Sequence, residues 1–92
     1  MADRLLRIYI NGASQKSLPA IANLRQICED NLTGQYQIEV VDLIEQPQLA
    51  ESEQIAAIPT VERRLPLPVR RVIGDLSDTA SALIGLQIEP KK

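Results

Sequence analysis

The sequence predicts an α/β domain that begins with a right-handed βαβ unit. Residues 4–10 and 36–43 alternate apolar and polar side chains, as half-buried strands do. Between these segments, apolar residues recur at steps of three and four, which indicates an amphipathic helix. Strands joined by a crossover helix pair in parallel, with right-handed connection. The first half of the chain therefore has one clear interpretation.

Each element of this first half has a recognisable beginning or end. Leu6, Ile8 and Ile10 share one face of the first strand, and Asn11–Gly12 ends it. Ser14 or Ser17 can cap the helix, and Pro19 suits its first turn. We expect Thr33–Gly34 to end the helix, and its buried stripe to comprise Leu18, Ile21, Leu24, Cys28 and Leu32.

The second strand and a short helix follow. Tyr36, Ile38 and Val40 are expected on one face of the second strand. Pro47 suits the first turn of a helical stretch that reaches about Ile55, with Glu51 and Glu53 toward solvent.

The remaining segment has two incompatible interpretations. In the first, Pro59 forms a cis turn before a strand, residues 69–73 form another strand, and Asp75 or Ser77 caps a helix through Ile84. This gives the thioredoxin-like order βαβαββα. In the second, a helix starts at Pro68 and runs through residues 69–73, and residues 82–88 form a strand. Gly85 weakens either element by about 0.5–1 kcal/mol.

Composition restricts the core and the chemistry. The 92 residues suffice for one domain, and the chain has no Phe or Trp, so the core must be aliphatic. With one cysteine and no histidine, the chain lacks an internal disulfide, a zinc-ligand set and Ser–His or Cys–His catalysis. The segment 11–17 has no cysteine, which argues against a dithiol enzyme, and Cys28 is expected to be a small buried hydrophobic residue.

Other classes of function are also disfavoured. No glycine-rich phosphate loop is present, so we expect no nucleotide or other cofactor and no enzymatic activity. A net charge of −2 and only two aromatic residues argue against nucleic-acid binding. No run approaches the ~20 apolar residues of a membrane span. We therefore expect a cytoplasmic binding module.

Charge is distributed unevenly along the chain. Eight acidic residues and no basic residue lie between Gln26 and Glu62, and four arginines follow within nine positions. We expect the acidic residues to form a solvated surface. The arginines, at positions 63, 64, 70 and 71, lie among apolar residues and are the best candidates for contact with an acidic partner or another copy.

Several segments resemble the KaiB family of circadian clock regulators. The most specific runs from Leu65 to Ser77 and combines prolines, an arginine pair and a Gly-Asp turn. Further matching segments are residues 8–12, 40–43, 46–51, 58–60 and 83–86. Leu67 interrupts a run of three prolines in the family, and Gln87 replaces a frequent aspartate. The sensory domain of the clock-output histidine kinase is also similar.

The resemblance implies one KaiB-like domain over residues 1–92, with a βαβ half (1–45) and a fold-switching half (46–92). It implies a ground-state order βαββααβ, usually tetrameric, and a rarer thioredoxin-like order βαβαββα. We expect the ground-state arrangement to predominate here, because self-association helps a small domain. By motif match, partner binding and switching are assigned to Pro59, Pro66, Pro68, Arg70, Arg71, Gly74, Asp75 and Gly85.

The resemblance also implies a partner. A KaiB-like regulator docks on the ATPase ring of a KaiC-type protein, in a circadian oscillator or a related stress-adaptation system, and KaiA or a histidine kinase joins as a further partner in some systems. Homo-oligomers, as tetramers or dimers, are expected. The alternative function is a thioredoxin-like interaction domain that serves histidine-kinase or stress signalling and never switches.

Overall fold

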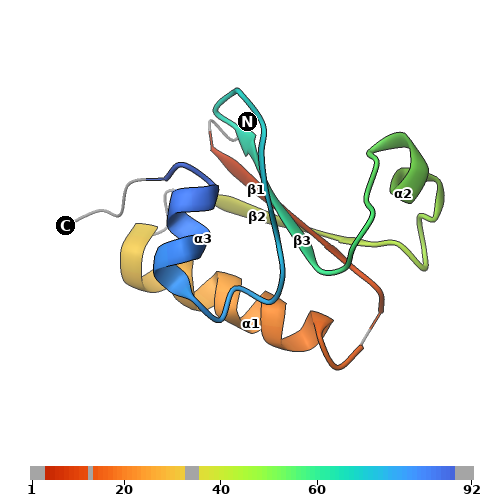
Figure 1. The fold of residues 1–92 in the computed structure, drawn as a ribbon, viewed down its shortest axis with the longest axis horizontal. Helices are drawn as coiled ribbons and strands as arrows, with labels where there is room; N and C mark the ends of the chain where they lie inside the picture. Colours follow the sequence, from red (N-terminus) through yellow and green to blue (C-terminus); the bar gives the residue numbers. More distant parts are fainter. Residues whose placement is uncertain (1–3, 13, 33–35, 89–92) are drawn as a thin grey trace.

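The thioredoxin-like arrangement is the one present in the computed structural model, which describes residues 4–12, 14–32 and 36–88 (Figure 1). The expectation that the ground-state arrangement predominates is therefore wrong for this structure. In chain order the elements are β1 (Leu5–Ile10), α1 (Ser17–Ile27), the π-helix η1 (Cys28–Leu32), β2 (Gln37–Asp42), α2 (Gln48–Ser52), β3 (Thr60–Leu65), β4 (Arg70–Ile73) and α3 (Thr79–Gly85).

The four strands form one sheet in the order β2-β1-β3-β4. β1 and β2 pair in parallel, which confirms the predicted βαβ unit, whereas β3 pairs antiparallel with both β1 and β4. β2 and β4 are consequently the two edges of the sheet. β4 is also the shorter of these edge strands, with only four residues.

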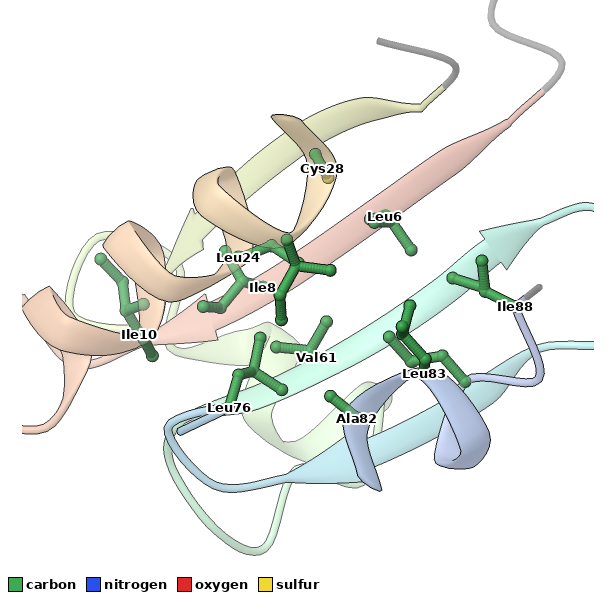
Figure 2. Packing of buried hydrophobic residues seen from close by; sticks show 13 residues of the cluster. Leu6, Ile8, Ile10, Leu24, Cys28, Val61, Leu76, Ala82, Leu83 and Ile88 are labelled. Carbon is green, nitrogen blue, oxygen red and sulfur yellow. The ribbon is translucent and has the colours of Figure 1, made fainter. Parts of the chain in front are cut away.

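One face of the sheet is covered by α1 and α3 (Figure 1). Leu6 and Ile8 of β1 and Val61 of β3 lie in the middle of this core and are fully buried (Figure 2). Leu24 of α1 and Leu83 of α3 pack against them from the helices. The core is aliphatic, as the composition predicts, and joins both halves of the chain.

The other face of the sheet carries a smaller apolar cluster. Tyr9, Val41 and Leu43 are buried there, and Leu49 with Ala50 from α2 packs on them. The Tyr9 ring lies opposite Ile8 and Ile10 because successive strand residues point to opposite faces. α2 therefore covers only part of this face, and charged side chains occupy the rest.

The inward face of α1 differs from the predicted stripe. Leu24 is 1% exposed as expected, but Leu18 is 56% exposed. The helix starts at Ser17, which is itself buried, and Ala20 and Ile27 complete its inward stripe. Leu18 then points about 100° away from Ser17. The N-cap of α1 is Lys16, which makes no side-chain cap hydrogen bond, so neither Ser14 nor Ser17 is the cap; the Ser14 hydroxyl oxygen does accept the N–H of Ser17 at 3.1 Å. The predicted end at residues 33–34 and the Leu32 side chain lie outside the described part.

In β2 the buried residue is Val41 rather than Val40, which is exposed. Ile38 packs against the main core, as predicted. Val40 lies on the same face as Ile38 but is 40% exposed, so the predicted apolar face of β2 is only partly buried.

The second half follows the first of the two predicted arrangements. The Ile58–Pro59 bond is cis, and residues 70–73 form a strand. α3 begins after Asp78, whose carboxylate accepts the Ser81 N–H at 3.1 Å, so the cap is neither Asp75 nor Ser77. The interpretation with a helix over 69–73 and a strand over 82–88 is wrong here: the β-branched Val72 and Ile73 pair with β3, and Asp78 stabilises a helix over 79–85.

We predict that Leu24→Ala lowers the free energy of unfolding by about 2–5 kcal/mol, because it leaves a cavity in the main core. Leu18→Ala on the same helix is the matched control and should change stability by no more than about 0.5 kcal/mol. Urea unfolding followed by circular dichroism measures both. Equal losses for the two variants would contradict the observed orientation of α1.

Candidate partner-binding site

The eight residues assigned from the resemblance lie in three places. Pro59, Gly74 and Asp75 come together where β3 begins and β4 ends. Pro66, Pro68 and Arg70 belong to the hairpin between these strands, with Arg71 further along β4. Gly85 lies at the end of α3, against β4. β4 is the element common to all three places.

The first place is a pair of loops joined by a main-chain hydrogen bond. The N–H of Gly74 donates to the carbonyl of the buried Pro59 at 2.9 Å. Gly74 has φ +123°, a conformation that L side chains rarely adopt, which explains the requirement for glycine. Asp75 accepts the N–H of Ser77 at 3.0 Å, and this bond lowers the pKa of its carboxyl group. Asp75 therefore shapes the turn into α3.

The hairpin between β3 and β4 is exposed and apolar. Pro66, Leu67 and Pro68 are all exposed, and the bonds preceding both prolines are cis. Val69 and Arg70 follow, also exposed. The Arg70 guanidinium makes no hydrogen bond or ion pair with any described residue. The hairpin thus offers a free cation beside apolar side chains.

Arg71, the neighbour of Arg70, is in a different situation. Its guanidinium donates twice to Oε2 of Glu62, a carboxylate on β3 whose side chain is fully buried. It also donates to the carbonyls of Gln54 at 3.0 Å and Glu53 at 2.8 Å. Arg64 donates to the other oxygen of Glu62 at 3.0 Å. Arg71 therefore joins β4 to β3 and to the residues that follow α2.

This ion pair belongs to a row of charges across the sheet. Residues opposite one another in the four strands read Glu39, Arg7, Glu62 and Arg71, from β2 to β4. Arg7 pairs with Glu39, and Glu53 lies 3.6 Å from Arg7 and 3.4 Å from Arg64. Alternating charges in cross-strand positions stabilise a sheet. The row fills the part of the second face that α2 leaves uncovered.

Arg63 occupies the opposite face of β3 and is also buried, at 7% exposure. Its guanidinium donates to the carbonyls of Pro68 and Gln87, at 2.9 Å each. Its Nε has no hydrogen-bond partner among the described residues. Arg63 therefore connects the hairpin to the residues after α3 by hydrogen bonds to main-chain carbonyls.

Gly85 allows α3 to approach β4 closely. A Cβ atom at this position would lie 2.5 Å from Cγ2 of Val72, nearer than real Cβ contacts come. This close approach explains why residue 85 is a glycine, although the backbone conformation at this position does not require one.

The sequence prediction missed two residues that hold the site together. Glu62 was expected on a solvated acidic surface, and this is wrong because it is fully buried between two arginines. Arg63 was recognised as part of a charge cluster but not as a buried residue. The one signal available was their place in a strand directly after Val61, where buried charges would need partners.

Cys28 is buried at the start of η1, and burial raises the pKa of its thiol. A raised pKa disfavours the thiolate, which is the reactive form. Among the described residues, no group of three or more His, Cys, Asp or Glu side chains is placed to hold a metal ion. No helix in this part of the chain has the length and hydrophobicity that crossing a bilayer requires.

We predict that Arg71→Met lowers the free energy of unfolding by about 1–3 kcal/mol, because one oxygen of a buried carboxylate loses both of its donors. Arg70→Met, one residue away and of identical chemistry, should cost no more than about 0.5 kcal/mol. Urea unfolding of both variants measures the difference. A loss in Arg70→Met that matched Arg71→Met would contradict the assigned partners.

We predict that Gly85→Val destabilises the thioredoxin-like arrangement by about 1–3 kcal/mol through overlap with Val72. Valine is chosen because Gly85→Ala also gains about 1 kcal/mol of helix propensity, which would mask the overlap. In a Val72→Ala background the penalty should fall by at least about 0.5 kcal/mol. A double-mutant cycle by urea unfolding tests this, and a zero coupling energy would refute the contact.

Comparison with known proteins identifies the relatives of this chain. A family model described as the KaiB domain matches residues 7–88. The circadian clock protein KaiB3 of Synechocystis sp. is 48% identical over 87 residues, which cover 95% of this chain and 85% of that protein. The circadian clock oscillator protein KaiB of Prochlorococcus marinus is 46% identical over 84 residues, covering 91% and 80%.

Solved structures confirm the fold. Chloroplastic thioredoxin z superimposes with a TM-score of 0.76 at 21% identity, covering 94% of this chain and 78% of that one. The N-terminal domain of Synechococcus elongatus SasA gives 0.74 at 19% identity, covering 91% and 81%. These likenesses concern the fold alone, whereas the family match and the clock-protein relatives extend over nearly the whole sequence: the chain belongs to the KaiB family of circadian clock proteins.

Proposed function

We propose that this chain is a non-enzymatic regulator that binds the ATPase ring of a KaiC-type protein. The observation that carries the proposal is Arg70, an exposed cation that has no partner among the described residues and lies beside the exposed apolar hairpin. Exposed arginine next to apolar side chains is typical of protein interfaces. The clock-protein names of the relatives support this class of partner.

The proposal includes a division of the single domain, residues 1–92, into two parts. Residues 1–45 keep their βαβ arrangement, and residues 46–92 exchange the observed arrangement with the ground-state order. The eight assigned residues act in this exchange or in docking. A tetramer or dimer of the ground-state form is part of the same proposal, as are a cytoplasmic location and, in some systems, KaiA or a histidine kinase as a further partner.

The time course of binding separates the proposal from its alternative. The protein is mixed with a KaiC-type ring, and complex mass is followed over hours by native mass spectrometry. Slow formation supports exchange between arrangements before docking. Binding complete on mixing supports an interaction domain that never switches. Absence of binding to every ring tested removes the proposed function.

We predict that Arg70→Glu weakens ring binding about tenfold or more, which corresponds to about 1.4 kcal/mol. Arg70 is the informative position because reversing the charge at Arg71 would also break its ion pair with Glu62. A loss of affinity at Arg71 could then not be distinguished from a loss of stability. Arg25→Glu, an exposed arginine on α1, is the matched control and should leave affinity unchanged. Unchanged affinity in Arg70→Glu, with unchanged urea midpoint, would remove the hairpin from the interface.

A further inference from the structure

The two edge strands of the sheet carry charges of opposite sign. β2 contains Glu39 and Asp42, whereas β4 contains Arg70 and Arg71. Among the described strands, each of these two pairs on one side only, β2 with β1 and β4 with β3. The side chains of Glu39 and Arg71 are 43% and 36% exposed, whereas the Glu62 side chain between the two edges is fully buried. The sheet therefore has an acidic edge and a basic edge.

Residues opposite one another across the sheet match at its two edges. One row begins at Glu39 of β2 and ends at Arg71 of β4, and the next row begins at Val40 and ends at Val72. If a second copy places its β2 beside β4 in the same register, a carboxylate meets Arg71 and a valine meets Val72. Cross-strand pairs of opposite charge stabilise a sheet, as do packed apolar pairs. The alternating charges of one molecule would then continue into the next.

The main-chain hydrogen bonds of β4 allow this register. The N–H of Gly74 donates to the carbonyl of Pro59 where the β3–β4 pairing begins. Opposite residues of antiparallel strands alternate between pairs that exchange hydrogen bonds and pairs that do not. Val72 therefore faces β3, whereas Arg71 and Ile73 direct their main-chain N–H and C=O groups away from it.

The main chain of β2 has the complementary phase. The N–H of Leu43 donates to the carbonyl of Ile10 at 2.9 Å, so the odd-numbered residues of this segment face β1. Ile38 and Val40 consequently direct their main-chain groups away from β1. In the register of the charge row, the N–H of Arg71 meets the carbonyl of Ile38 of a second copy, and the C=O of Arg71 meets the N–H of its Val40. A shift by one residue would lose these bonds and turn the matched side chains to opposite faces.

Pairing of like edges is less favourable. β4 beside β4 would bring two arginine pairs together, and β2 beside β2 would bring Glu39 and Asp42 of two copies together. Like charges in such positions destabilise a sheet. β2 and β4 also run in the same direction, because β2 is parallel to β1 and β3 is antiparallel to both β1 and β4. A copy displaced along the sheet therefore presents its β2 to β4 in parallel.

We propose that the basic edge of this chain, β4, binds the acidic edge, β2, of a second copy, and so continues the sheet from one molecule to the next. Arg71 lies opposite Glu39 of the second copy, and Val72 lies opposite its Val40. Because the two surfaces differ, the contact is head to tail, and a pair of molecules keeps one free edge of each kind for further copies. The contact forms between thioredoxin-like molecules and does not rest on the proposed ring binding.

The unchanged chain is tested first, by ¹⁵N amide spectra recorded at rising protein concentration. We expect the signals of Ile38, Val40, Arg71 and Ile73 to shift together, with an apparent Kd below about 1 mM. Raising NaCl from about 0.05 to about 0.5 M should weaken the association at least about threefold, because salt screens charges at an exposed edge. The proposal is overturned if these signals are independent of concentration, or if salt strengthens the association.

Two proline variants then test whether unlike edges pair. Val40→Pro and Ile73→Pro each remove an outward N–H and no hydrogen bond within the sheet, a position where edge strands tolerate proline. In samples whose chemical shifts show residues 70–73 as a strand, each variant alone should sediment as a monomer. Their equimolar mixture should form a dimer and no larger species, because each copy keeps the edge that the other has lost.

Val40→Thr is the matched control, because it keeps the main-chain N–H and the branched shape, and it should associate within about threefold of the unchanged chain. A dimer of either proline variant alone would indicate pairing of like edges and overturn the proposal, as would a mixture that stays monomeric. The concentration and salt dependence of the unchanged chain decides the question even if proline disrupts a strand.

Discussion

Two consecutive charges on β3, Glu62 and Arg63, hold the second half of the molecule in place. They point to opposite faces of the sheet, and both are buried. A charge removed from water needs partners, and leaving one unpaired costs several kcal/mol. Glu62 accepts hydrogen bonds from Arg71 of β4 and from Arg64. Arg63 donates hydrogen bonds to the carbonyls of Pro68 and Gln87. These two side chains thus attach β4, the hairpin before it and the residues after α3 to β3.

The attachment of β4 is largely polar, whereas α3 packs on the main core through Ala82 and Leu83. Val72 is the one residue of β4 that packs against the main core. α3 approaches Val72 closely because Gly85 has no side chain. Buried ion pairs contribute more to the choice of one arrangement than to net stability, because desolvation offsets much of their attraction. Such polar contacts favour one arrangement while adding little net stability. This is the condition that exchange between two arrangements only a few kcal/mol apart requires.

The first half was predictable because its patterns are long and agree with one another. Ile8 and Leu24 are buried, as strand and helix periodicity predict. The prediction that Leu18 is buried is wrong because the helix begins at Ser17, which is the buried residue of that turn. The second half was not decided by pattern, because residues 69–73 form too short a segment to favour one element. Glu62 was assigned to solvent because a charged residue usually is exposed, and only tertiary partners reverse that rule.

β4 links the arrangement of the second half to its surface. Its inward residue Val72 packs against α3, its charged residue Arg71 binds Glu62, and Arg70 and Ile73 remain exposed at its two ends. Under the proposed exchange, a partner that contacts Arg70 in this geometry recognises a strand that the ground-state order would not present in the same way. At a concentration of 100 Kd, such a partner stabilises the bound form by about 2.7 kcal/mol. If the second half exchanges between two arrangements only a few kcal/mol apart, as proposed, docking on β4 would shift the population toward the arrangement that carries it.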